Sequence, residues 1–171
     1  LEMLKIATKL KKRVVIGTTG FNKSQENLIK KCSKKIPILK AGNMSLGINL
    51  LMYLTEIASS SLGNTFLSKV FEIHHKHKKD YPSGTALMIQ KKILERFSDL
   101  NLSFNMLSER KGDVYGIHQV SLLSNESIVC TFAHKAENRS IFANGAIKAA
   151  KLLINKKPNL YSIKDFLPDL L

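Results

Sequence analysis

The segment that most constrains the fold is a short apolar run that ends in a loop of glycine and threonine. Residues 14–16 are Val-Val-Ile, and residues 17–20 are Gly-Thr-Thr-Gly. This pattern is typical of a parallel strand that is buried on both faces. Residues 22–33 follow with capping residues and apolar positions at helical spacing, and residues 36–42 form a second apolar run. Strand, helix and strand in this order predict a βαβ unit within a parallel sheet.

The pattern changes after residue 43, which predicts an α/β unit followed by an α+β unit. Helical spacing predicts helices over 46–61, 84–97 and 141–154, and a short helical turn over 161–167. Residues 65–73 are predicted to be extended, and 102–132 to form antiparallel strands with a turn at 124–125. In the first of these helices, the stripe of Leu46, Leu50 and Leu54 is predicted to pack in the core.

Composition excludes several classes of protein. The longest apolar stretches are interrupted well before the roughly 20 residues that cross a bilayer, so no membrane segment is expected. Cys32 and Cys130 lack the spacing of a disulfide framework or a zinc site, so a cytoplasmic location is expected. The first residues do not form a secretory signal and lack an initiator Met, so we expect the sequence to begin within a longer protein.

The net charge of +14 raises the alternative of a nucleic-acid-binding protein. The basic residues lie in small groups spread over different predicted elements, and lysine is far commoner than arginine. This distribution favours a solvated surface together with a site for a small anion. No nucleic-acid partner is expected, although the alternative stays open.

The most informative segment is residues 72–86, Glu-Ile-His-His-Lys-His-Lys-Lys-Asp-Tyr-Pro-Ser-Gly-Thr-Ala. Histidine can transfer protons near neutral pH, and lysine supplies positive charge. The amide N–H groups of Ser83, Gly84 and Thr85 begin a predicted helix, where a carboxylate can bind. We therefore predict a site for an anionic substrate.

Two alternatives for this segment stay open. One is a solvated basic loop, and the other is a metal site formed by His74, His75 and His77. Adjacent residues of an extended segment point to opposite faces, and the lysines repel a divalent cation, so no metal is expected. The loops at 17–20 and 41–45 are weak signals by themselves, because a plain strand-to-helix turn explains each of them equally well.

Taken in order, four motifs resemble the 4-hydroxy-tetrahydrodipicolinate reductase family, also called dihydrodipicolinate reductase. They are VVIGTTGF at 14–21, GNMSLGIN at 42–49, the HHKHK and PSGTA segments within 72–86, and NRSIFANGA at 138–146. The resemblance implies reduction of a cyclic dicarboxylate substrate with NADPH or NADH as cofactor. It extends over nearly the whole chain.

The resemblance also implies roles for individual residues. His74 resembles the family's proton donor/acceptor and Lys78 its second catalytic donor. His75 resembles a substrate-contacting histidine, and Gly84 with Thr85 resembles the pair that holds a substrate carboxylate; Ser83 lies beside them. The cofactor-binding residues implied are Gly17, Thr18, Thr19, Ala41, Gly42, Asn43 and Met44.

The implied organisation has three parts. Residues 1–43 resemble the C-terminal part of a Rossmann-like dinucleotide-binding domain, and 44–150 a substrate-binding and tetramerisation domain with a mixed or antiparallel sheet. Residues 151–171 are expected to pack back toward the nucleotide-binding part, and the family forms homotetramers. The chain departs from the family by lacking its glycine-rich N-terminal turn and by a shortened region at 108–116. A second hypothesis is therefore a catalytically incompetent fragment that acts as a dicarboxylate-binding or assembly module.

Overall fold

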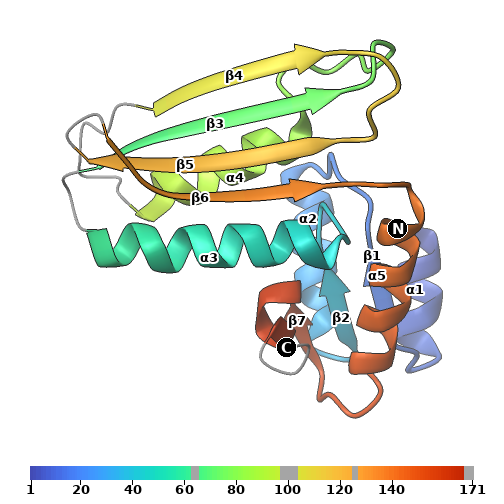
Figure 1. Cartoon of the computed structure of the whole chain (residues 1–171). Helices are drawn as coiled ribbons and strands as arrows, with labels where there is room; N and C mark the ends of the chain where they lie inside the picture. Colours follow the sequence, from blue (N-terminus) through green and yellow to red (C-terminus); the bar gives the residue numbers. More distant parts are fainter. Residues whose placement is uncertain (63–65, 97–103, 125–126, 168–171) are drawn as a thin grey trace. The chain divides into compact units, whose positions relative to one another are not determined.

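The protein consists of two compact units, described here from a computed structural model (Figure 1). The structure describes residues 1–62, 66–96, 104–124 and 127–167. Unit 1 comprises Leu1–Leu46 and Ser140–Leu171, and unit 2 comprises Gly47–Arg139. The predicted ends at residues 65, 97 and 102, and residue 125 of the predicted turn, lie outside the described residues.

Unit 1 contains a parallel sheet of three strands in the order β1-β2-β7. The strands are β1 (Val14–Ile16), β2 (Pro37–Lys40) and β7 (Asn159–Tyr161). Its helices are α1 (Glu2–Lys9), α2 (Lys23–Ser33) and α5 (Ser140–Leu152), followed by the 3-10 turn η1 (Ile163–Phe166). The predicted βαβ unit is therefore confirmed, and β7 extends it by one strand that the sequence analysis did not predict.

Helix α2 begins where its capping residues predict. The Asn22 side chain accepts a hydrogen bond from the Gln25 N–H, and the Gln25 side chain accepts one from the Asn22 N–H, both at 2.9 Å. Two amide groups at the helix start are thereby satisfied reciprocally. Behind this cap, Ile29, Ile36 and Ile38 are fully buried between the helices and the sheet.

Unit 2 contains a mixed sheet of four strands in the order β4-β3-β5-β6. The strands are β3 (Leu67–His74), β4 (Phe104–Arg110), β5 (Ile117–Ser124) and β6 (Ser127–Lys135). β5 is antiparallel to both β3 and β6, as predicted, but β4 is parallel to β3. The prediction of antiparallel strands throughout 102–132 was wrong at β4, because helix α4 (Gly84–Arg96) lies between β3 and β4 in the chain and such a crossover returns the strand in the same direction.

Helices α3 (Leu46–Leu62) and α4 supply the apolar side chains that pack against the sheet of unit 2. The core includes Leu51, Ile89 and Ile93 from the helices and Val70 and Val120 from the strands. Residues at every second position of β3 are buried, which is the alternation of a strand covered on one face.

The prediction for the buried stripe of α3 was wrong. Leu54 is 38% exposed and Leu46 and Leu50 are half-buried, whereas Ile48, Leu51, Thr55 and Ser59 are buried. Apolar residues occur around much of this helix, so spacing alone does not identify the side that faces the sheet. Among the described residues, no helix combines the length and the apolar character that a membrane crossing requires.

The limits of the compact units differ from the predicted domain limits of 43 and 150. Helix α5 belongs to unit 1 by its contacts, since the division lies between Arg139 and Ser140. The functional domains assigned by resemblance stay predictions.

Candidate active site

The pairing of three strands brings four polar side chains of unit 2 together. Glu72 and His74 lie two residues apart on β3 and therefore point to the same face of the sheet. In the strand register, Glu72 is opposite His118 on β5, and His74 is level with Arg110 on β4. With Ser83, which precedes α4, these residues form a set that we call the Glu72 cluster: Glu72, His74, Ser83, Arg110 and His118.

Glu72 is the centre of this cluster and is fully buried, with 0% of its surface exposed. Its Oε1 accepts hydrogen bonds from the Ser83 N–H and from Arg110 Nη1, each at 3.1 Å, and its Oε2 is paired with His74 Nδ1. Burial alone would raise the pKa of Glu72, but the Ser108 hydroxyl, the Ser83 N–H, His74 and Arg110 outweigh it and lower the pKa. Glu72 is therefore an ionised carboxylate.

The ionised Glu72 determines which nitrogen of His74 is available for proton transfer. Because the carboxylate accepts at Nδ1, that nitrogen carries a hydrogen, and Nε2 remains for exchange with another group. Burial lowers the pKa of His74 while Glu72 opposes this effect, and Lys78 and Arg110 lower it further. His74 is therefore mostly neutral near pH 7, with a carboxylate in place to stabilise its protonated form.

The space beside His74 Nε2 depends on a glycine. A Cβ added to Gly116 would lie 2.9 Å from this nitrogen, so an alanine there would press on the ring. The His118 ring lies edge-to-face with His74, with 4.9 Å between ring centroids. The site therefore includes two residues outside the motif at 72–86: Gly116, which precedes β5, and His118, which lies within β5.

His118 and Ser83 connect the cluster to the start of α4. His118 Nε2 and Ser83 Oγ are hydrogen-bonded at 3.2 Å, and Ser83 Oγ also accepts from the Ala86 N–H at 3.1 Å. Burial, followed by the charge of His74, lowers the pKa of His118 to about 3, so this imidazole is neutral. Ser83, predicted to bind substrate, is buried and acts here as the cap of α4.

The amide groups of Ser83 and Gly84, predicted to bind a carboxylate, already have carboxylate partners within the chain. The Ser83 N–H donates to Glu72, and the Gly84 N–H donates to Asp80 Oδ2 at 3.1 Å. Asp80 Oδ1 is 2.7 Å from Lys78 Nζ. The hydrogen bond from Lys78 lowers the pKa of Asp80 to about 2.

The other predicted residues of the segment 72–86 lie around the ion pair of Lys78 and Asp80. Lys78 is close enough to His74 to lower its pKa, so the two predicted catalytic residues lie in one site. His75 and Thr85 are half-buried, whereas His77 is exposed with its ring centroid 6.4 Å from that of His75. Lys76 and Lys79 are exposed.

The predicted metal trio is not the group whose ligand atoms converge. Among the described residues, the atoms of Glu72, His74 and His118 that could bind a metal lie within 4.8 Å of one another. The Arg110 guanidinium already bonds the same carboxylate, which makes a second cation there unfavourable. The absence of a metal stays a prediction.

The predicted cofactor loops of unit 1 begin side by side at one edge of its sheet. β1 and β2 are adjacent and parallel, and the Ala41 N–H donates to the Ile16 carbonyl at 3.0 Å, where both strands end. Gly17, Thr18 and Thr19 are exposed, as is Gly42. The carboxyl edge of a parallel sheet is where α/β proteins bind ligands, so this exposed backbone fits a nucleotide.

The remaining predicted cofactor residues, Asn43 and Met44, support these loops from inside the protein. Asn43 and Met44 are buried, and Asn43 Oδ1 accepts from the Ser45 N–H at 2.8 Å. A Cβ added to Gly17 would be in ordinary contact with Met44, 3.6 Å from its Cε. A Cβ added to Gly145 of α5 would lie only 1.8 Å from the Met44 carbonyl oxygen, so α5 packs directly on this loop.

Sequence reasoning assigned no role to Glu72, Arg110 or His118. The position of Glu72 two residues before His74 on a predicted strand was a usable signal, because it places both side chains on one face. Arg110 and His118 depend on strand pairing, for which the sequence offers no local signal.

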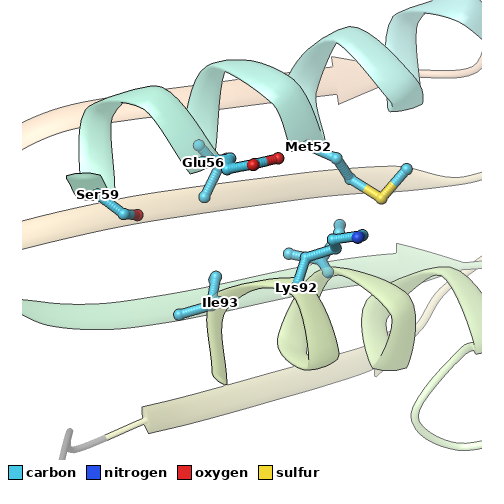
Figure 2. Close-up of a pocket in the computed structure, with 7 residues that line it drawn as sticks. Met52, Glu56, Ser59, Lys92 and Ile93 are labelled. Carbon is cyan, nitrogen blue, oxygen red and sulfur yellow. The ribbon is translucent and has the colours of Figure 1, made fainter. Parts of the chain in front are cut away.

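A small hollow between α3 and α4 lies apart from these residues (Figure 2). Figure 2 shows Met52, Glu56 and Ser59 of α3 facing Lys92 and Ile93 of α4 across it. Its volume of about 10 Å³ is what a single water molecule needs, and none of its lining residues belongs to the Glu72 cluster. The chemistry therefore centres on the cluster.

Known proteins match this chain along nearly its whole length. The family model described as dihydrodipicolinate reductase, N-terminus, matches residues 1–44, and the model described as dihydrodipicolinate reductase, C-terminus, matches residues 47–167. A 4-hydroxy-tetrahydrodipicolinate reductase of Pelagibacter ubique (strain HTCC1062) is 56% identical, covering 98% of this chain and 71% of the relative. The protein of the same name from Bdellovibrio bacteriovorus is 44% identical, covering 97% and 70%.

A solved structure supports the fold independently of close sequence identity. The dipicolinate-bound dihydrodipicolinate reductase from Paenisporosarcina sp. TG-14 matches with a TM-score of 0.79 at 22% identity, covering 97% of this chain and 69% of that one. Both units thus have the fold of these reductases, which confirms the predicted fold class. The matches to both family models and the high identity show that the chain belongs to the dihydrodipicolinate reductase family.

Proposed function

We propose that this chain catalyses the reduction of 4-hydroxy-tetrahydrodipicolinate to tetrahydrodipicolinate with a pyridine nucleotide, in diaminopimelate and lysine biosynthesis. The family and the names of the relatives support this activity. The observation that carries the catalytic part is the pairing of buried His74 with ionised Glu72, with Lys78 close by.

The substrate proposed is a cyclic dicarboxylate, and the described charges suit it. Lys78 and the Gly84 amide at the start of α4 already hold the Asp80 carboxylate, so the same ammonium and amide groups suit a carboxylate of the substrate, and Thr85 follows them in α4. His75, half-buried beside them, is proposed to contact the substrate. The dipicolinate bound in the Paenisporosarcina structure is a ligand of this chemical class.

His74 is proposed to supply the proton of the reaction. The net change adds one hydride and one proton to the substrate, which loses its hydroxyl as water, and the bound nucleotide supplies the hydride. A dianionic substrate near His74 raises the pKa of the imidazole, and Glu72 holds the resulting N–H at Nδ1. Nε2 then delivers the proton, and Lys78 is a second donor beside it.

The nucleotide is proposed to bind the exposed backbone of Gly17, Thr18, Thr19 and Gly42. Ala41, Asn43 and Met44 then act mainly by shaping the second loop, since Asn43 and Met44 are buried. NADPH and NADH both fit this proposal, and the ratio of their kcat/KM values decides between them. A homotetramer in the cytoplasm, as the family resemblance implies, is part of the same proposal, and light scattering of the purified protein tests the tetramer.

The function is tested by following the oxidation of reduced nicotinamide with freshly generated substrate. His74→Ala and Lys78→Ala are each expected to lower kcat by about two to four orders of magnitude, in line with the loss of a positioned proton donor. Lys79→Ala is the matched control, because Lys79 is an exposed lysine next to Lys78 and its removal leaves the site intact.

Two results would contradict the assignment. If the His74 and Lys78 variants kept the kcat of the unmodified protein, these residues would not be the donors. If the unmodified protein bound pyridine-2,6-dicarboxylate in calorimetry without any turnover, it would be a binding module instead.

A further inference from the structure

Asp80 already makes the contacts that the substrate carboxylate is proposed to make. One of its oxygens lies 2.7 Å from Lys78 Nζ, and the other accepts from the Gly84 N–H at 3.1 Å. Lys78 and Gly84 are both residues assigned above to catalysis or to substrate binding. A carboxylate bridging an ammonium group and an amide at a helix start is the arrangement expected for the bound substrate.

We propose that Asp80 is an internal competitor that occupies the anion site in the free protein and is displaced by a carboxylate of the substrate. The inference rests on the proposed function, because it takes the site at Lys78 and Gly84 to be the substrate site. Asp80 is then a residue that sets the affinity for the substrate without touching the reacting atoms.

The main chain of Asp80 is fixed while its side chain is exposed. Arg110 Nη2 donates to the Asp80 carbonyl at 2.5 Å, which ties this point of the loop to the Glu72 cluster. The Asp80 side chain is 52% exposed. The carboxylate can therefore turn into water about its own side-chain bonds while the loop stays in place.

The contacts that must break are weak enough to exchange. The Asp80 side chain is more than half exposed and that of Lys78 is 24% exposed, so water solvates the carboxylate almost as well as the ion pair does. A doubly negative substrate that makes further contacts can replace one such carboxylate. Small single anions make fewer contacts and compete less well with an aspartate that is always present.

The test is the affinity of the purified chain for pyridine-2,6-dicarboxylate, measured by calorimetry. Asp80→Asn removes the charge and keeps an oxygen that can accept from the Gly84 N–H, so the helix start is retained. We expect this variant to bind the dicarboxylate about fivefold more tightly. Glu95→Gln is the matched control, because Glu95 lies in the last turn of the same helix, is 51% exposed and pairs with lysines. Its affinity should equal that of the unmodified protein.

A double variant identifies the contact responsible. If the gain arises from releasing Lys78, then Asp80→Asn should give no gain in a Lys78→Gln background. Equal or weaker binding by Asp80→Asn, with normal binding by Glu95→Gln, would overturn the inference and make Asp80 a residue that positions Lys78. If no protein in the series bound the dicarboxylate, the proposed substrate site itself would fail.

Discussion

The two candidate sites of this chain are built in opposite ways. In unit 1, the loops after β1 and β2 expose backbone at Gly17 and Gly42 and carry no ionisable side chain at residues 17–20 or 41–45. In unit 2, the Glu72 cluster is buried and its charges are paired inside the protein. Added atoms therefore disturb both sites, since a Cβ at Gly116 would also press on His74, but the second site is in addition sensitive to removed charge.

The largest expected effect is the loss of the central carboxylate of unit 2. Glu72→Ala removes the partner of Arg110 and of His74, which leaves a guanidinium without its buried counter-ion. We expect the free energy of unfolding to fall by about 4 kcal/mol, as measured by urea denaturation. Glu109→Ala is the control, because Glu109 is exposed on the neighbouring strand β4, and it should change stability by less than about 0.5 kcal/mol. Equal effects of both substitutions would mean that burial of the charge is unimportant.

The next effect tests the sensitivity of unit 1 to added atoms. Gly145→Ala places a Cβ 1.8 Å from the Met44 carbonyl oxygen, so α5 or the 41–45 loop must move. We expect a loss of about 3 kcal/mol in unfolding free energy. In Gly17→Ala, the added atom meets Met44 at 3.6 Å, so stability should be retained while the KM for the nucleotide rises. A stable Gly145→Ala protein with unchanged nucleotide KM would remove the distinction between the two sites.

The sequence was sufficient for those elements whose signals are local. The apolar run at 14–16, the capping box at Asn22 and the alternation in β5 and β6 each predicted the element that the structure contains. Helix α1 and strand β7 were missed: eight residues give α1 few periodic positions, and β7 reads Asn-Leu-Tyr, which lacks the continuous β-branched apolar run that identifies β1. For α3, the apolar residues surround so much of the helix that its buried side had to come from packing.

The candidate site was predictable only where it is continuous in the chain. His74, Lys78 and Gly84 lie within one segment, and the structure brings the first two close together. Arg110 and His118 reach Glu72 through strands that pair across long distances in sequence. That Ser83 and Gly84 already donate to Glu72 and Asp80 could not be inferred from the motif, because a motif does not reveal which partners its amides have found.

The smallest expected effect is the pH dependence that the buried histidines impose. His118 has a pKa of about 3 in the folded protein, whereas the unfolded chain titrates near the ordinary value of 6.5. The unfolded state therefore binds more protons between these values, so the stability from neutral His118 is complete above 6.5 and is lost as the pH falls. We expect His118 to contribute a loss of about 2 kcal/mol between pH 7 and pH 5.

Urea denaturation of the unmodified protein and of His118→Gln at both pH values checks this estimate. The pKa values of His74 and His134 are also lowered by burial, so the unmodified protein should lose more than the His118 share. Asp80 and Glu72 have pKa values below their ordinary 3.8 and 4.5, so protonation of these carboxylates changes the stability mainly below pH 5. Identical pH slopes for the two proteins would show that His118 is not held neutral by burial.

Unit 1 is built from two separate stretches of the sequence, and this affects the order in which the chain folds during synthesis. Strand β2 pairs with β1 on one edge and with β7 on the other, and the whole of unit 2 lies between β2 and β7 in the sequence. Unit 2 is one uninterrupted stretch, so a ribosome can release all of it before β7 has been made. The nascent sheet of unit 1 must therefore wait with the β7 edge of β2 unpaired while unit 2 folds, which leaves residues 37–40 open to premature association with other chains.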